Sequence, residues 1–128
     1  MRLLIDTQSF IWFSEDDKRL PTAVRTMMDD NTNSLVISIA SFWEITIKMS
    51  LGKLILSENI ETMINMAVNN GFEILPIKPT HLISLSALDL FHKDPFDRII
   101  IAQAITENMS TISSDNIFSS YPVNNIWR

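Results

Sequence analysis

The 128-residue sequence contains no cysteine, only two glycines and only five prolines. The lack of cysteine excludes disulfides and thiolate-bound metals, and it agrees with a reducing compartment. With so little glycine and proline, we expect regular helices and strands joined by short connections. Hydrophobic residues make up 46% of the chain, which is enough for a packed interior. Residues 1–128 are therefore expected to form one domain.

Long hydrophobic runs are also missing. No stretch approaches the roughly 20 apolar residues that a membrane helix needs. Near the N-terminus, the apolar residues 3–5 are interrupted by Asp6, and this run is too short for the apolar region of a secretory signal. We therefore expect a cytoplasmic protein without membrane segments.

Positive charge is in short supply, with 10 Lys and Arg against 15 Asp and Glu and a net charge of −5. This balance disfavours a protein that holds nucleic acid mainly by neutralising phosphates, because that kind of affinity comes from Lys and Arg. It does not exclude a nuclease, since bound divalent cations can invert the local potential of an acidic cleft.

Short apolar runs and helical periodicity alternate along the chain. The predicted strands are residues 2–6, 35–39, 72–75 and 111–113, with a last edge strand at 124–127. The predicted helices are residues 9–13, 20–28, 41–50, 58–68, 79–88 and 94–107, with one helical turn at 117–120. Strands that alternate with helices predict an α/β fold with a central parallel sheet of four to five strands, covered by helices on both faces.

Four acidic residues follow or flank these strands. Asp6 ends the first strand, and Asp115 follows the fourth. Glu44 lies in the helix after the second strand, and Asp97 lies in the first turn of the helix before the fourth. Because ligands of open parallel sheets collect beyond the carboxyl ends of the strands, we expect the four carboxylates to meet at one edge.

Each acid also has a purely structural explanation. Ser41 and Glu44 have the spacing of a capping box. Asp94 precedes a first-turn proline, as an N-cap does, and Asp97 suits the positive end of the helix dipole. The other two acids are explained equally well as partners of turn or helix amides. Capping does not explain why all four lie at the same end of the sheet, so the converging arrangement is favoured.

Such a cluster suits hard divalent cations. Mg²⁺ and Mn²⁺ select carboxylate oxygens, and one or two such ions activate water and stabilise the oxygens of a phosphodiester undergoing cleavage. The chain contains no phosphate-binding glycine loop, no histidine set with zinc spacing and no nucleophile elbow.

Four segments resemble PIN-domain proteins of the VapC toxin type. The H-x-D-P-F-D-R sequence with the apolar helix after it is the most specific of them, and the W-E-I-x-I-K sequence adds to it. The segments are LLIDTQSFIW (3–12), SIASFWEITIKMSLGKL (38–54), HKDPFDRIIIAQAITE (92–107) and TISSDNIFSSYPVNNIW (111–127). The resemblance covers the whole chain, with Gln8 where relatives often carry His and Ser113 in place of a commoner Thr.

The resemblance implies a PIN fold, a three-layer α/β/α arrangement, and a Mg²⁺- or Mn²⁺-dependent nuclease. The residues that match the acidic metal-binding and catalytic set are Asp6, Glu44, Asp97 and Asp115. The residues expected to support this set are Thr7, Ser113, Asp94 and Arg98. Lys48, four residues after Glu44, is explained equally well by a helix-surface ion pair with Glu44 and by a phosphate contact. His92 is a second candidate substrate contact. Lys53 and Lys93 are expected to be solvated, with RNA contact as the lesser alternative, and His81 is expected to lie on a helix surface.

Members of this type are usually toxins of type II toxin–antitoxin pairs that cleave RNA. They are silenced by a cognate antitoxin and are commonly homodimers. The alternative interpretation is a non-catalytic PIN-like module that binds RNA or a protein. A phospho-acceptor signalling domain is disfavoured, because Asp6 has no acidic neighbour and no lysine follows the last strands. The substrate RNA, its cleavage site and the number of metal ions do not follow from the sequence.

Overall fold

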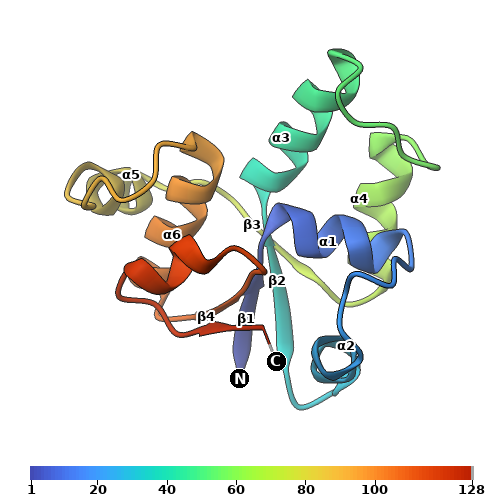
Figure 1. Ribbon diagram of the computed structural model, residues 1–128, viewed down its shortest axis with the longest axis horizontal. Coiled ribbons are helices and arrows are strands. Elements are labelled where there is room, and N and C mark those ends of the chain that lie inside the picture. The colour runs from blue at the N-terminus through green and yellow to red at the C-terminus, as the bar shows by residue number, and fades with distance from the viewer. Residues whose placement is uncertain (128) are drawn as a thin grey trace.

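The computed structural model describes residues 1–127. Its strands are β1 (Arg2–Ile5), β2 (Ser34–Ser38), β3 (Glu73–Leu75), β4 (Ser110–Ile112) and β5 (Asn125–Ile126). They form one sheet in the order β3-β2-β1-β4-β5, and every pairing is parallel (Figure 1). The predicted parallel sheet of four to five strands is therefore confirmed.

Helices cover both faces of this sheet. The first group comprises α1 (Thr7–Ser14), α2 (Thr22–Asp29), α3 (Ile39–Ser50) and α4 (Ile60–Asn69). The second group comprises α5 (Pro79–Ser86), α6 (Pro95–Glu107) and the 3-10 helix η1 (Asn116–Ser120). Figure 1 shows the sheet between α1, α2 and α4 on one side and α5 and α6 on the other. Within residues 1–127, no helix combines the length and apolarity needed to cross a membrane.

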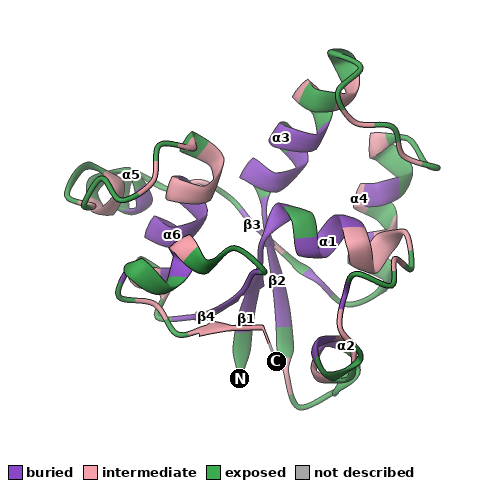
Figure 2. Cartoon of the chain, viewed as in Figure 1, coloured by how far each residue is buried: buried purple, intermediate pink, exposed green. Residues whose placement is uncertain are grey.

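The strands are buried on both faces, as their continuous apolar sequences predict. In β1, Leu3 and Ile5 belong to the core cluster beneath α1–α4, while Leu4 belongs to the cluster beneath α6 and η1. Successive side chains of a strand point to opposite faces, so a strand between two helical layers has no solvated side. Figure 2 shows the buried class along the central strands and on the inner sides of the helices.

Strands β1 and β2 each end one residue before their predicted limits, because the N-cap of the following helix lies at the end of the strand. Asp6 is the N-cap of α1, and its Oδ1 accepts a hydrogen bond from the Ser9 amide at 2.8 Å. Ser38 is the N-cap of α3, and its hydroxyl accepts from the Ala40 amide at 3.1 Å. Both connections are thus nearly direct strand-to-helix transitions, which place the first turns of α1 and α3 at the carboxyl edge of the sheet.

The expected surface position of His81 is wrong. Its side chain is fully buried, with Nδ1 accepting from the Lys78 amide at 2.9 Å and Nε2 lying 2.9 Å from Glu107 Oε2. This pattern fixes the Nε2–H tautomer, because Nδ1 is already an acceptor. His81 therefore joins the start of α5 to the end of α6, a long-range pairing that helical periodicity does not reveal.

The C-terminus of α6 depends on a left-handed residue. Asn108 has φ = 54° and caps the helix, as Asn or Gly often does. We expect Asn108→Ala to lower the free energy of unfolding by about 1 kcal/mol, because most residues with a β-carbon are strained in this conformation and Asn is one of the few that tolerate it. Asn108→Gly should be neutral or slightly stabilising. Urea unfolding midpoints measure both, and a neutral alanine variant would contradict the prediction.

Candidate active site

A cavity of about 430 Å³ opens at the carboxyl edge of the sheet, between the ends of the strands and helices α1, α3 and α6. It brings together all four acids predicted from the sequence. The carboxylates that line it are those of Asp6, Glu44, Asp94, Asp97 and Asp115. Two lysines, Lys48 and Lys53, also line it.

Asp6 lies at the bottom of this arrangement, only 5% exposed. Its Oδ1 caps α1, and its Oδ2 accepts a 2.6 Å hydrogen bond from the Ser113 hydroxyl. Burial raises the pKa of Asp6; the hydrogen bonds from Ser113 and Ser9 oppose the increase, and the nearby Glu44 adds to it. The carboxylate is therefore held in place, but its negative charge is under-compensated.

Glu44 is buried in α3, and its two oxygens differ. Oε2 lies 2.6 Å from Lys48 Nζ, whereas Oε1 is buried without a hydrogen-bond partner. The alternative explanation of Glu44 as part of a capping box is wrong, because Ser38 caps α3 and Glu44 lies beyond its first turn. Ser41 instead accepts a 2.9 Å hydrogen bond from the Thr7 hydroxyl, which ties α1 to α3 beside the cavity.

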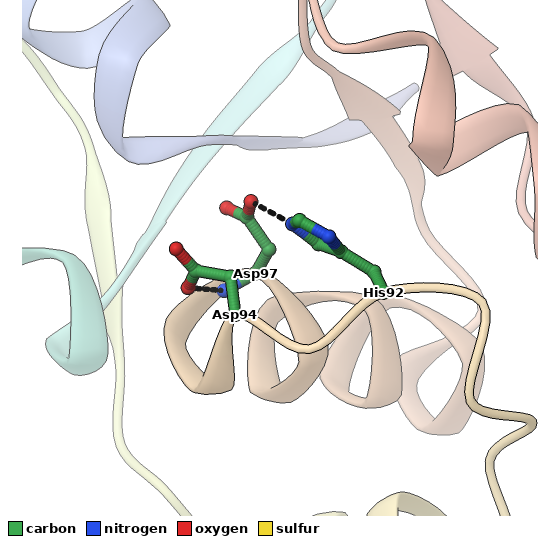
Figure 3. A group of neighbouring side chains, drawn as sticks. All are labelled: His92, Asp94 and Asp97. Atoms are coloured by element: carbon green, nitrogen blue, oxygen red, sulfur yellow. Dashed lines mark hydrogen bonds and ion pairs between the residues drawn. The ribbon is translucent and has the colours of Figure 1, made fainter.

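Asp97 projects from the first turn of α6, next to Asp94 and His92 (Figure 3). Asp94 is the N-cap, and its Oδ1 accepts from the Phe96 and Asp97 amides. His92 Nε2 lies 2.9 Å from Asp97 Oδ2. Burial raises the pKa of Asp97 to about 6, with the His92 hydrogen bond opposing the rise and Asp94, Asp6 and Glu44 adding to it.

Asp115 is the N-cap of η1, where its Oδ1 accepts from the Ile117 amide at 3.0 Å. Ser113 connects it to Asp6, because the Ser113 hydroxyl donates to Asp6 and accepts from the Asp115 amide at 3.0 Å. The predicted position of Ser113 beside the acids is what the structure shows. A single hydroxyl thereby sets the spacing between the acid after β1 and the acid after β4.

Arg98 does not join the acids. Its guanidinium donates to the carbonyl oxygens of Asp89, His92 and Leu88 and contacts the Tyr121 hydroxyl. Tyr121 in turn accepts from the His92 amide at 2.9 Å. Arg98 therefore acts on the site indirectly, by holding the loop that carries His92.

Lys53, Gln8 and Ser114 also line the cavity. Lys53 is exposed, as predicted, and nevertheless borders the cavity. Lys53 lies in the connection after α3, where no periodicity indicates which way a side chain points. The only feature of the sequence that points to Lys53 is its position shortly after α3, the helix that carries Glu44.

The donor set fits a hard divalent cation. It consists of carboxylate oxygens, and the buried, unpartnered Glu44 Oε1 lacks the hydrogen bond that a buried acceptor normally has. A second grouping, His92, Asp94 and Asp97, has ligand atoms within 4.8 Å of one another. We favour the carboxylate cavity, because it contains the buried, unpartnered Glu44 Oε1, whereas none of the unpartnered buried atoms found among the described residues belongs to His92, Asp94 or Asp97. In either grouping, Asp97 would be a ligand.

The raised pKa of Asp97 predicts a pH-dependent stability for the metal-free protein. The folded value of about 6 exceeds the unfolded value of 3.8, so the folded state takes up the proton first as pH falls. The contribution of Asp97 to stability is fully present below pH 3.8 and is lost as pH rises through about 6. Its full size is about 2–3 kcal/mol.

Thermal melts in a chelator at about pH 5 and pH 7 measure this effect. The wild-type protein should lose stability between about pH 5 and pH 7 through Asp97, and Asp97→Asn should reduce this difference between the two melting temperatures. An unchanged pH dependence in that variant would assign the effect to other groups.

Comparisons with known proteins agree with this architecture. The PIN domain family model matches residues 3–124. No curated protein matches the sequence. Among solved structures, VapBC2 from Rickettsia felis, bound to a DNA fragment from its promoter, has a TM-score of 0.74 and 15% identity, with 98% of each chain covered.

Two further structures share the fold. FitAcB from Neisseria gonorrhoeae has a TM-score of 0.65 and 16% identity, with 97% of this chain and 96% of that chain covered. A toxin–antitoxin complex from Klebsiella pneumoniae has a TM-score of 0.65 and 20% identity, with 97% and 95% covered. At these identities the structural likeness establishes the fold, and the family model spans nearly the whole sequence. The chain belongs to the PIN domain family.

Proposed function

We propose that the protein is a Mg²⁺- or Mn²⁺-dependent endoribonuclease. The observation that carries the proposal is the cavity at the sheet edge, where Asp6, Glu44, Asp97 and Asp115 converge and one buried carboxylate oxygen has no partner. Hydrogen bonds alone leave this set of charges poorly compensated. A divalent cation would satisfy the free oxygen and offset the mutual repulsion of the acids.

In this proposal, Asp6, Glu44 and Asp97 hold the cation and Asp115 completes the set directly or through water. The bound cation would activate water and offset the charge that develops on the phosphodiester oxygens. Ser113 holds Asp6 through its 2.6 Å hydrogen bond, and His92 orients Asp97. Lys48 and Lys53 both line the cavity, and in this proposal they bind RNA phosphates.

The test is cleavage of end-labelled RNA by the purified protein with Mg²⁺, with Mn²⁺ and with a chelator. We expect fragments only with the ions. Ion uptake in calorimetry without any cleavage of a broad set of RNAs would favour the non-catalytic RNA- or protein-binding module. Absence of ion uptake at millimolar concentrations would reject the metal site itself.

We further propose that the protein is the toxin of a type II toxin–antitoxin pair, active in the cytoplasm, homodimeric and silenced by an antitoxin protein. Support comes from the fold shared with chains of solved complexes described as VapBC and as a toxin–antitoxin complex. Induction of the chain alone should arrest growth, and co-expression of a small neighbouring gene should restore it. Growth unaffected by induction of the active nuclease would contradict the toxin role. Light scattering measures the oligomeric state, and we expect the mass of a dimer.

A further inference from the structure

Lys48 is paired with the same carboxylate that the proposed cation needs. Its Nζ lies 2.6 Å from Glu44 Oε2, one helical turn away on α3. The pKa of Lys48 is raised, chiefly by the hydrogen bond to Glu44, with burial opposing the increase and Asp94 and Asp97 adding to it. The ammonium is therefore attracted by three of the cavity acids.

The two partners differ in their freedom to move. The Glu44 side chain is 7% exposed, whereas the Lys48 side chain is 46% exposed. A long, half-exposed lysine can swing into solvent while its stem stays on the protein surface, but a buried glutamate cannot follow it. If one partner leaves the pair, it will be Lys48.

Lys48 also occupies a special place in the charge balance of the cavity. Five carboxylates line the cavity, and among residues 1–127 Lys48 provides the one lysine or arginine side chain that forms an ion pair with any of them. The ammonium thus compensates the cavity when no divalent ion is bound. A divalent ion on Glu44 would repel it at short range.

We propose that Lys48 is an exchangeable counter-ion: it neutralises Glu44 in the metal-free cavity, is displaced when a divalent cation binds, and then contacts an RNA phosphate at the cavity mouth. This inference rests on the proposed nuclease function and adds a role that the metal ligands do not supply. It couples the two binding events, because the ion releases the ammonium that the RNA uses.

The opposing explanation is that Lys48 only positions Glu44. The two explanations predict opposite signs when the charge is removed. A positioning residue would be needed for metal binding, so its loss would weaken metal affinity. A competing counter-ion would instead be displaced at a cost, so its loss would strengthen metal affinity.

Calorimetric titration with Mn²⁺ distinguishes these outcomes without using activity. We expect Lys48→Met to bind Mn²⁺ about five-fold more tightly than wild type. Lys48→Arg, which keeps the charge, should stay near wild type. Lys18→Met makes the same change in net charge at an exposed site that does not line the cavity, and it should have no effect. Thermal melts check that each variant is folded.

An unchanged or weaker Mn²⁺ affinity of Lys48→Met, with normal uptake by wild type, overturns the exchange alone. No uptake by wild type or any variant overturns both the exchange and the metal-dependent function. The failures of the two proposals are therefore distinguishable.

The second arm measures binding of a fluorescent single-stranded RNA, with Ca²⁺ as the ion and intact RNA verified on a gel, and again in a chelator. We expect Lys48→Met to weaken binding more in Ca²⁺ than in the chelator. In Ca²⁺ it should also reduce the slope of log affinity against log salt by about 0.7, the value for one lost phosphate contact on a single strand. An equal loss in both conditions, or a loss equal to that of Lys18→Met, would overturn the proposal.

Discussion

Asp6→Asn and Asp97→Asn are each expected to reduce ion-dependent RNA cleavage by about 100-fold or more. Both carboxylates line the cavity. The charge of Glu44 contributes to the raised pKa of both acids, and Asp6 also contributes to that of Asp97. An amide keeps the shape of the side chain but loses the charge that binds a hard cation. The variants therefore remove the proposed ligands without removing the surrounding packing.

The same substitutions should leave the metal-free protein as stable as wild type or more stable. Burial raises the pKa of both acids, so at neutral pH their ionised forms oppose folding. The Asp6→Asn variant would retain the helix cap, because an asparagine side-chain carbonyl accepts from the N3 amide as well as an aspartate does. It would lose the hydrogen bond from Ser113, because the amide nitrogen does not accept, so its gain in stability should be smaller than that of Asp97→Asn. Loss of activity with a gain in melting temperature is a combination that general misfolding cannot produce.

Three measurements check this prediction: cleavage rate at saturating Mn²⁺, Mn²⁺ affinity by calorimetry, and melting temperature in a chelator. Asp29→Asn is the matched control, because Asp29 is an exposed acid at the end of α2 that does not line the cavity. It should change none of the three beyond small effects. Cleavage at the wild-type rate by both site variants would mean that the acids at the sheet edge do not hold the catalytic ion.

Much of the site followed from the sequence because strand ends are easy to recognise. Asp6 closes an apolar run and Asp115 follows another, so a parallel sheet brings them to one edge whatever the details of packing. Capping a helix and lining the cavity are not mutually exclusive roles for these acids. Asp6, Asp94 and Asp115 each cap a helix and also line the cavity, since a helix that starts at the strand ends exposes its first amides there.

What the sequence did not predict depends on contacts between distant segments. The hydrogen bond between His92 and Asp97 depends on a loop that Arg98 and Tyr121 hold from two different elements. The burial of His81 depends on Glu107, 26 positions later. Local sequence patterns indicate which face of an element is apolar, but they do not indicate which polar groups meet across elements. For this reason the sequence did not predict that one Glu44 oxygen lacks a hydrogen-bond partner.

Phe10→Ala is expected to have the largest effect on stability. Phe10 is fully buried on α1, and its ring packs edge-on against Phe42 of α3 and Phe72 before β3, with centroids 5.5 Å and 5.6 Å away. Removing such a ring leaves a cavity at the centre of the α1–α4 layer, at a cost of about 3–5 kcal/mol. Total stabilities of natural domains are about 5–15 kcal/mol, so this one change removes a large share.

The effect should extend to the site, because α1 carries Asp6 and Thr7 at its start and the Phe10 amide donates to the Asp6 carbonyl at 3.0 Å. Urea unfolding measures the loss, and Mn²⁺ affinity at low temperature reports on the site while the variant is still folded. Phe10→Leu should cost less than about 1.5 kcal/mol, because most of the volume is kept. Phe91→Ala is the control for removing a phenyl ring, because Phe91 is 55% exposed. An equal loss of unfolding free energy in Phe10→Ala and Phe91→Ala would contradict a core built around Phe10.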